Sequence, residues 1–547
     1  MLFHQSMRYL LLIFVCSNGI NSFAQDTIKR RSVDITSTFK PTLKEAAKIN
    51  LNASPATVDT TRPRLLYNIP NQNLNFAYQP GMLRPLALAI DTGGIWDNWN
   101  YVKLGYGSLK NPYLETGLSL GNGNTAGVNL YGFHTNSKGK IKFQNYKTTN
   151  IDVTGFLQTS KHLEWNGRVG AKEENFNKYG FEPKTLEIDE DSLEVKLQTF
   201  TTRLSFRNIN RTAFGLSYAP EAELNLFKDR LNNTESNTHI HLPLNKTIGN
   251  IFEVAVALTA DFTRYSPDSK DAITNNYFVF SPSIFYKKSN INIQAGIKPS
   301  WDSEGFKLFP NIMAELSSVD RQFTIQAGWI GHLRKNSYHY LTSLNPWIWA
   351  PETITTSSIQ EIYGGVKGSV TDHLTYSAKI GFNNYTNQPL FVNDTSSGKS
   401  FMVVTEPSMK AINVSGEVGY NVGERFSMLT GLTVNRYMNL KENSNPWGLI
   451  PLELRTAIRI QVLKDLYVKG DMYAFSTPWY LSEDGSKRGK GAMDLSAGLE
   501  FAVVKNVKVW AQFNNLMSNE YERWHQYPVY GFNFLGGVVL SIEQKNK

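Results

Sequence analysis

Charged side chains that alternate with apolar residues are the part of this sequence most able to do chemistry. Within Leu454–Val462, Arg455 and Arg459 occupy positions between apolar residues. On other runs of the same kind, three acidic residues also stand opposite an apolar face: Glu417, Asp471 and Asp494. Successive side chains of a strand point to opposite faces, so the spacing predicts that these five charges line a polar interior. The simplest interpretation is a generic polar lumen in which these charges are hydrated or paired. The functional interpretation is that they select a substrate or bind a polypeptide segment in the lumen.

Two histidines and an acidic run are the remaining candidates for chemistry. His239 and His241 are two residues apart and would face the same way on a strand, but a metal ion needs further ligands and the sequence indicates none. The acidic run Glu187–Glu194 lacks the ligand spacing and glycine of a dedicated calcium loop, which favours a solvated loop. No strand–turn context marks an activated Ser/His or Asp/His pair. We therefore expect no metal, no cofactor and no enzymatic activity.

The elements that must position these charges are strands with one apolar face. In Ile251–Tyr265, Ala411–Val422 and Met493–Val503 the apolar residues fall at every second position. This two-residue period predicts half-buried strands rather than helices. Runs of this kind continue from about residue 99 to the end of the chain and number about 22, within a range of 16–22.

The links between these runs alternate in length. Tight links such as Gly423-Glu424 and Lys464-Asp465 alternate with long polar or aromatic loops such as 336–355 and 477–490. Short periplasmic turns and longer extracellular loops are typical of bacterial outer-membrane barrels, whose strand numbers are even. The sequence therefore predicts an all-β fold, a transmembrane antiparallel β-barrel over residues 99–547. A soluble propeller or β-helix would show a fixed sequence period, and these hairpins have none.

Composition agrees with a barrel in the cell outer membrane. The chain has 547 residues, of which 41% are hydrophobic and 12% aromatic, and its mean hydropathy is −0.33. After the amino terminus no stretch approaches the roughly 18 apolar residues that a membrane helix needs, whereas alternating strands hide their hydrophobicity from window averages. The net charge of +9 is spread thinly. We therefore expect contact with outer-membrane lipid and lipopolysaccharide and no binding of nucleic acid.

The first 98 residues differ in character from the rest. Residues 1–24 have the pattern of a cleaved signal peptide, with an apolar run at Leu10–Val15 and a small-x-small site ending at Ala24. The only cysteine, Cys16, lies in this segment, and a lipoprotein alternative is disfavoured because a bulky valine precedes it. Residues 25–98 hold six prolines, which predicts an extended segment in the periplasm or the barrel lumen.

The end of the chain resembles the closing hairpin of TonB-dependent receptors. An alternating run ends at Asn514-Asn515-Leu516, and a Phe/Gly-rich last run carries apolar residues from Phe532 to Ile542. Between them lies a loop rich in aromatic residues, with Tyr521, Trp524, Tyr527-Pro528 and Tyr530. The resemblance implies a receptor-type barrel of the outer membrane. One departure is that the last strand, expected to reach Ile542, runs on into a polar tail.

Near the amino terminus the resemblance is to a plug-lacking branch of these barrels. It rests on Lys40–Leu43 and Ala47–Asn50, on the following Pro-rich stretch, and on the run Ser137–Tyr146. Residues 25–98 are too short for the plug that normally occludes a barrel of this size. The lumen would then be closed by the Pro-rich segment, by inward-folded loops or by a partner, or it would stay open.

The resemblance implies transport or uptake across the outer membrane. A segment that could add a strand to an energy-transducing protein consists of Val33, Asp34, Ile35, Thr36, Ser37 and Thr38. The alternative is a non-transporting structural or accessory subunit of a larger outer-membrane assembly or secretion complex, docked through the same arm. A surface lipoprotein is a further candidate partner.

Tryptophans near strand ends and in loops are the last group of candidate functional residues. Trp347 and Trp349, inside loop 336–355, are the best candidates for a contact surface or an inward-folded constriction. Anchoring at the membrane interface is the default expectation for the others: Trp165, Trp301, Trp329, Trp447, Trp479 and Trp524.

Overall fold

The part of the chain described in the computed structural model is 73% strand. It comprises residues 98–121, 125–160, 163–181, 189–268, 270–318, 322–371, 373–395, 399–423 and 425–544. The expected signal peptide 1–24, the Pro-rich segment up to residue 97 and the candidate coupling residues Val33–Thr38 lie outside these described residues. Among the described residues, no helix is long and apolar enough to cross a membrane.

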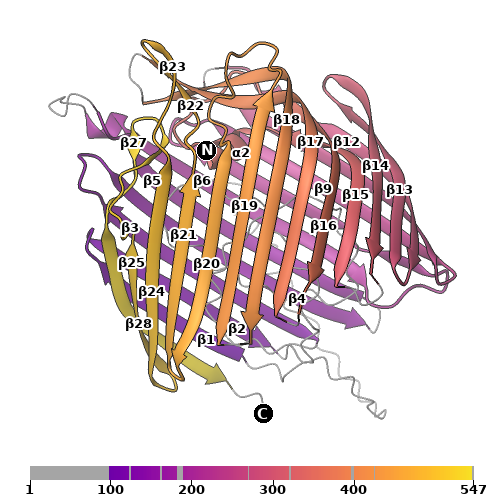
Figure 1. Ribbon diagram of the computed structural model, residues 1–547, viewed down its shortest axis with the longest axis horizontal. Helices are drawn as coiled ribbons and strands as arrows, with labels where there is room; N and C mark the ends of the chain where they lie inside the picture. The colour runs from indigo at the N-terminus through magenta and orange to yellow at the C-terminus, as the bar shows by residue number, and fades with distance from the viewer. Residues whose placement is uncertain are drawn as a thin grey trace, which may run out of the picture.

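Twenty-two antiparallel strands form a closed barrel (Figure 1). They are β1 (Asn98–Gly107), β2 (Asn111–Gly121), β3 (Ala126–Lys138), β4 (Asn145–Ser160), β5 (Leu163–Asn177), β6 (Glu194–Asn208), β8 (Glu221–Asp229), β9 (Thr234–Ile248), β10 (Phe252–Ser266), β12 (Tyr277–Lys288), β13 (Ile291–Asp302), β14 (Gly305–Ser317), β15 (Phe323–Lys335), β16 (Thr356–Ser369), β17 (Leu374–Asn393), β18 (Phe401–Val422), β19 (Phe426–Met438), β20 (Leu452–Leu463), β21 (Leu466–Phe475), β24 (Ala492–Val504), β25 (Val507–Asn514) and β28 (Asn533–Gln544). The predicted all-β barrel of about 22 strands is confirmed.

Short elements lie between the wall strands. Two brief strands, β7 (Leu216–Tyr218) and β11 (Ile273–Thr274), extend the sheet beside β9 and β10. The loops carry a 3-10 turn η1 (Glu190–Ser192), the helix α2 (Tyr338–Leu344), and two small hairpins: β22 (Trp479–Ser482) with β23 (Gly485–Arg488), and β26 (Glu522–Trp524) with β27 (Tyr527–Pro528).

The first and last wall strands close the ring by pairing with each other. β1 and β28 run antiparallel in register from Asn98 opposite Gln544 to Gly107 opposite Leu535. The last strand therefore continues past Ile542, where the sequence predicts its end, because β1 supplies pairing partners for the polar tail. It begins at Asn533, so Phe532 lies just before it.

Alternation along each strand separates an apolar outer face from a polar inner face. On β24, Leu499, Phe501 and Val503 are exposed, whereas Asp494 and Ser496 on the opposite face are buried. A charge on the lipid face of such a barrel costs about 2–4 kcal/mol at the membrane midplane. The two-residue period of the sequence thus directs the charged side chains toward the lumen.

The two ends of the barrel differ in the length of their connections. The long loops, with β22, β23 and β27, gather at the top of Figure 1, and the short turns lie at the opposite end with the end of β28. The largest cluster of buried hydrophobic residues also lies at the long-loop end, where strand-end residues such as Phe176 and Tyr265 meet loop residues such as Leu341 and Trp347. The fold thus places its main core across one mouth of the barrel.

Candidate functional site: the loop closure

The long-loop end is covered by contacts between five loops, which we call the loop closure. It is made by residues of the loops 178–181, 336–355, 399–400, 439–451 and 515–532. The loops after β15, β17 and β19 are neighbours along one arc of the ring, whereas those after β5 and β25 come from other parts of it, so contacts between these groups cross the mouth. In the described residues, inward-folded loops therefore meet across part of the mouth.

Loop 336–355 starts with α2, which a wall carboxylate fixes in place. The backbone N–H groups of Tyr338 and His339 donate to the carboxylate of Glu235 on β9, at 2.6 and 3.3 Å. The Tyr338 hydroxyl donates to Asp229 at 2.7 Å, and Ser337 caps the helix through the N–H of Tyr340. The first N–H groups of a helix have no partner within it, and a carboxylate there is favoured by the helix dipole.

After α2, Trp347 joins three parts of the ring. Its side chain is only 3% exposed, and its indole stacks on Tyr527 with 3.9 Å between centroids and 21° between planes. The edges of Phe176 and Tyr179 meet the same indole. Aromatic pairs contribute about 0.5–1.5 kcal/mol beyond the area they bury. Trp347 therefore couples the β15–β16 loop to the β25–β28 loop and to the end of β5.

Lys399 connects two other loops through its ammonium group. Its Nζ donates to the backbone carbonyls of Gly180 at 2.8 Å and Gln526 at 3.2 Å. It lies 5.0 Å from the ring centroid of Phe181 and 5.1 Å from that of Tyr527. The Tyr527 hydroxyl donates back to the Lys399 carbonyl at 2.7 Å. One buried cation thus holds the loops after β5, β17 and β25 together.

Loop 439–451 is fastened by Glu406 of β18. The Glu406 carboxylate accepts the backbone N–H of Lys441 at 2.7 Å and that of Asn443 at 2.9 Å, and the Asn443 side chain donates at 3.0 Å. A carboxylate that accepts several N–H groups forms strong, charge-assisted hydrogen bonds. Further along the loop, the Trp447 carbonyl accepts from the backbone N–H of Phe391 at 3.2 Å.

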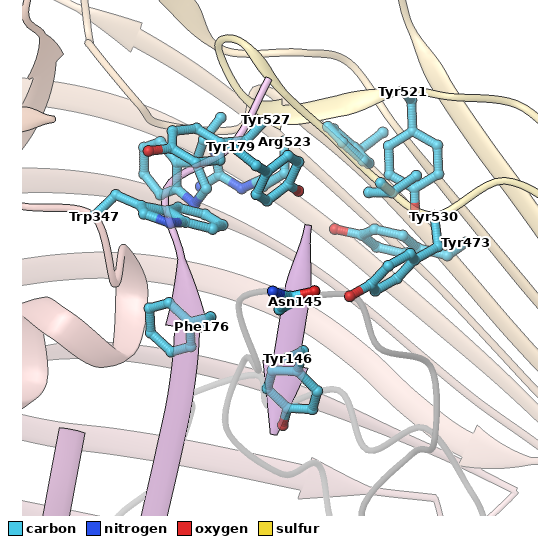
Figure 2. Close-up of a pocket in the computed structure, with 13 residues that line it drawn as sticks. Asn145, Tyr146, Phe176, Tyr179, Trp347, Tyr473, Tyr521, Arg523, Tyr527 and Tyr530 are labelled. Atoms are coloured by element: carbon cyan, nitrogen blue, oxygen red, sulfur yellow. The ribbon is translucent and has the colours of Figure 1, made fainter. Parts of the chain in front are cut away.

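A recess lies against the closure, with about 590 Å³ of empty space including part of the open solvent. Figure 2 shows Trp347, Tyr179 and Tyr527 on one side of it and Tyr473, Tyr521 and Tyr530 on the other. Its walls are therefore aromatic faces and hydroxyl groups. Arg523 adds a cation that donates to the Gly448 carbonyl at 3.0 Å and lies 4.1 Å from the Trp524 ring centroid.

Burial changes the pKa of several loop groups. It lowers the pKa of His339 from 6.5 to about 4, with the positive charge of Lys172 acting in the same direction. It raises the pKa of Tyr530 to about 12 and lowers that of Lys178 below the ordinary range for a lysine. The loop closure therefore contains a neutral imidazole and neutral phenols at physiological pH.

The candidate charges take different positions along the inner wall. Arg455 donates to Glu453 at 2.7 Å, and the Arg459 guanidinium lies 4.3 Å from the Tyr467 ring centroid. Glu417 and Asp494 are buried, and Asp494 accepts the Tyr521 hydroxyl at 3.0 Å. Asp471 is in register with Ala457 and Ser496. Of the interactions named here, only the hydrogen bond of Asp494 reaches a loop of the closure. Arg455, Arg459, Glu417 and Asp471 lie along the barrel wall.

The tryptophans differ in burial in a way that the sequence did not indicate, with Trp165 and Trp479 half-buried. Trp301 and Trp329 are exposed on the outer wall, as interface anchors are. The anchoring expectation is wrong for Trp447 and Trp524, which are buried in the loop packing because their loops fold inward. Of the loop pair, Trp347 is buried in the loop closure, whereas Trp349 is 51% exposed.

The two histidines have ordinary surroundings. His239 lies 3.3 Å from Asp261, and His241 lies 2.9 Å from the Thr259 hydroxyl. The described part of the chain contains no group of three or more His, Cys, Asp or Glu residues placed to hold a metal ion.

Sequence reasoning missed the residues that hold the closure: Lys399, Glu406, Glu235 and Tyr527. Tyr527 appeared only within the aromatic loop. The other three are single charges, Lys399 in a loop and Glu235 and Glu406 near the beginning of β9 and of β18. Their roles depend on loops that are distant in sequence, such as the 128 positions between Tyr527 and Lys399. The density of aromatic residues in loops 336–355 and 515–532 was the only available signal.

Comparison with known proteins shows similarity of fold. No family model matches the sequence, and no curated protein is significantly similar to it. The siderophore receptor PirA from Acinetobacter baumannii gives a TM-score of 0.63 at 10% identity, over 82% of this chain and 81% of that chain. A mutant of the ferric enterobactin receptor PfeA from Pseudomonas aeruginosa gives 0.62 at 11% identity, over 82% and 81%. P. aeruginosa FpvA with bound pyoverdines gives 0.61 at 11% identity, over 81% and 72%. The chain thus has the barrel fold of these solved structures.

Proposed function

We propose that this protein is an outer-membrane transporter that takes up a solute through its barrel and opens and shuts the outer mouth with its own loops. The observation that carries the proposal is the loop closure, in which Trp347, Tyr527 and Lys399 join loops from distant wall strands. A passage that must exclude other molecules between transport events needs such a closure. The fold likeness to siderophore receptors supports uptake as the activity.

The proposed partner is an energy-transducing protein of the periplasm. Val33–Thr38 would add a strand to that partner, because an extended segment pairs through its backbone and needs little sequence specificity. The partner would supply the free energy that parts the loops. A surface lipoprotein would act at the other mouth and deliver the solute.

Deletion of residues 33–38 tests the proposal. Loss of growth on one limiting nutrient, with normal levels of the protein in the outer membrane, is the expected result. Deletion of residues 53–58, of the same length and in the same Pro-rich segment, is the matched control and should leave growth unchanged. A general envelope defect with normal uptake would contradict the proposal and support a structural subunit of a larger assembly.

Co-purification from native outer membranes gives an independent test. A tag at the exposed β22–β23 tip, near Asp484, allows extraction in mild detergent. An energy-transducing protein or a surface lipoprotein in stoichiometric amount is expected. Stoichiometric components of a secretion or assembly machine would instead assign the barrel to that machine.

A further inference from the structure

The inner face of β17 and β18 holds four buried polar atoms that lack a hydrogen-bond partner among the described residues. One, Oδ1 of Asn421, lies near the end of β18, and the other three are Oγ of Ser377, Oγ of Ser415 and Oε2 of Glu417. Native structures satisfy nearly all of their buried polar groups, so each exception requires an explanation. An unpaired buried carboxylate is the most costly kind, and the Glu417 residue is only 9% exposed.

Strand register brings the three groups together. Ser377 and Glu417 are direct partners across β17 and β18, and such partners have Cβ atoms about 5 Å apart. Ser415 precedes Glu417 by two positions and so shares its face. Val414 and Val418, on the opposite face, are exposed on the outer wall, so the three polar side chains face the lumen.

The residues paired with Glu417 and its neighbours supply no cation to its carboxylate. On its other side the register partner is Gly431 of β19, which has no side chain. Lys379, the partner of Ser415, lies 2.7 Å from the Glu361 carboxylate. Arg455, the partner of Gly431, donates to Glu453 at 2.7 Å. No ion pair within the described part of the chain involves Glu417.

We propose that Ser377, Ser415 and Glu417 form a luminal binding site for a primary ammonium group. An ammonium has three N–H donors and no acceptor, which matches one carboxylate oxygen and two hydroxyl oxygens that all lack a partner. The bond to Glu417 would be charge-assisted and therefore the strongest of the three. A quaternary ammonium carries the same charge but has no donor, so the site should discriminate against it.

This chemistry has two possible sources. One is a solute that passes through the lumen and carries an amine. The other is a lysine in the part of this chain before Asn98, which after the expected signal peptide contains Lys29, Lys40, Lys44 and Lys48. The proposal concerns the inner wall and does not depend on whether the barrel transports a solute.

Thermal unfolding of the full chain in detergent tests the site. The probe is ethylammonium chloride, and tetramethylammonium chloride at equal concentration is the control for charge and ionic strength. If the source is a solute, ethylammonium raises the unfolding temperature of the wild type, because a ligand that binds only the folded protein stabilises it. Tetramethylammonium does not raise it. Glu417→Gln should weaken ethylammonium binding by about tenfold or more, as expected for a lost charged hydrogen bond. Glu315→Gln is the matched control, because that carboxylate pairs with Lys367 on strands that do not carry the site, and it should retain the response.

A lysine source gives a different pattern. The wild type does not respond to ethylammonium because the site is already filled, and Glu417→Gln lowers the unfolding temperature without any added amine. A full-length variant with Lys29, Lys40, Lys44 and Lys48 replaced by glutamine then becomes responsive to ethylammonium. The proposal is overturned if ethylammonium and tetramethylammonium act alike on both the wild type and the lysine-substituted chain.

Discussion

At the scale of single residues, the loop closure depends on side chains that combine a ring face with a polar bond. Tyr527 presents its ring to Trp347 and its hydroxyl to the Lys399 carbonyl. Arg523 lies over the Trp524 ring and donates to the Gly448 carbonyl. Since each of these residues touches two or more loops, removal of one should loosen contacts well beyond its own position.

Replacement of Trp347 by alanine should open the mouth. Truncation of a buried tryptophan costs about 3–5 kcal/mol, and the Tyr527 stack and the Phe176 and Tyr179 edges are lost with it. We expect cells with Trp347→Ala to become sensitive to large hydrophilic antibiotics. Trp349→Ala is the matched control, since the exposed Trp349 should be dispensable for the closure. Equal sensitivity of the two variants would show that the stack does not close the mouth.

His339 should make the closure sensitive to acid. Its ring stacks on Phe227 with 5.0 Å between centroids, and its pKa falls from 6.5 to about 4 in the closed structure. A histidine with a lowered pKa stabilises the closed form fully above pH 6.5, and this contribution is lost as the pH falls toward about 4.

His339→Phe should remove that part of the pH dependence while keeping the ring contact. The measurement is antibiotic permeability or unfolding temperature of both proteins between about pH 7.5 and about pH 5. Carboxylates of the closure also titrate near the lower limit, so the difference between the two proteins is the informative quantity. Parallel pH curves for the two proteins would exclude a role for His339.

At the scale of elements, the wall strands were predictable because each one has a two-residue alternation of apolar and polar residues within its own sequence. The two-residue alternation in Ile251–Tyr265 and Met493–Val503 corresponds to β10 and β24 with small shifts at the ends. The end of β28 was not predictable from its own residues. Its polar tail pairs because β1 lies beside it, and that partner is more than 400 positions away in the chain.

The seam between β1 and β28 depends on glycine and one tryptophan. The Trp510 indole of β25 donates to the Leu104 carbonyl of β1 at 3.1 Å, and a Cβ on Gly105 would lie 2.4 Å from that indole. A Cβ on Gly537 of β28 would lie 1.9 Å from the Leu104 carbonyl oxygen. The two strands can therefore approach closely only without side chains at these positions.

Gly537→Ala should weaken the seam and lower the temperature at which the folded barrel unfolds on a gel. Gly470→Ala is the matched control, because a Cβ at Gly470 on β21 would meet nothing within 4 Å. Overpacking of a tight site costs about 1–3 kcal/mol. Similar unfolding temperatures for the two variants would mean that the seam adjusts without cost.

The anchoring of loop 439–451 by Glu406 is testable by proteolysis. Glu406→Ala removes the acceptor for the N–H groups of Lys441 and Asn443, so the loop should detach from β18 and trypsin should cleave after Lys441. Glu442→Ala is the matched control, because Glu442 is an exposed carboxylate in the same loop. Cleavage at equal rates in both variants would show that the hydrogen bonds to Glu406 do not hold the loop.

At the scale of the whole molecule, the sequence predicts the barrel but not what covers its mouth. A strand requires a local pattern, whereas the closure requires that loops from distant strands meet, as Lys399 meets Gly180 and Gln526. Nothing in the type or spacing of Lys399 marks that role. The aromatic content of loops 336–355 and 515–532 indicated packing of some kind, and the same aromatic residues are equally typical of membrane anchoring.

Whether uptake requires the loops to part can be tested with a reversible cross-link. Ile348 and Phe401 form an isolated parallel bridge between loop 336–355 and β18, and bridge partners lie within the distance range that a disulfide needs. After removal of the expected signal peptide the chain has no cysteine of its own, so Ile348→Cys with Phe401→Cys introduces the only pair. If the solute passes through the mouth where these loops meet, the oxidised protein should fail to restore growth in a deletion strain. Adding a reductant should then restore growth. The single variant Ile348→Cys controls for the substitution itself. Growth supported by the oxidised double variant would mean that the solute crosses without movement of these loops, and that the closure serves only to seal the barrel.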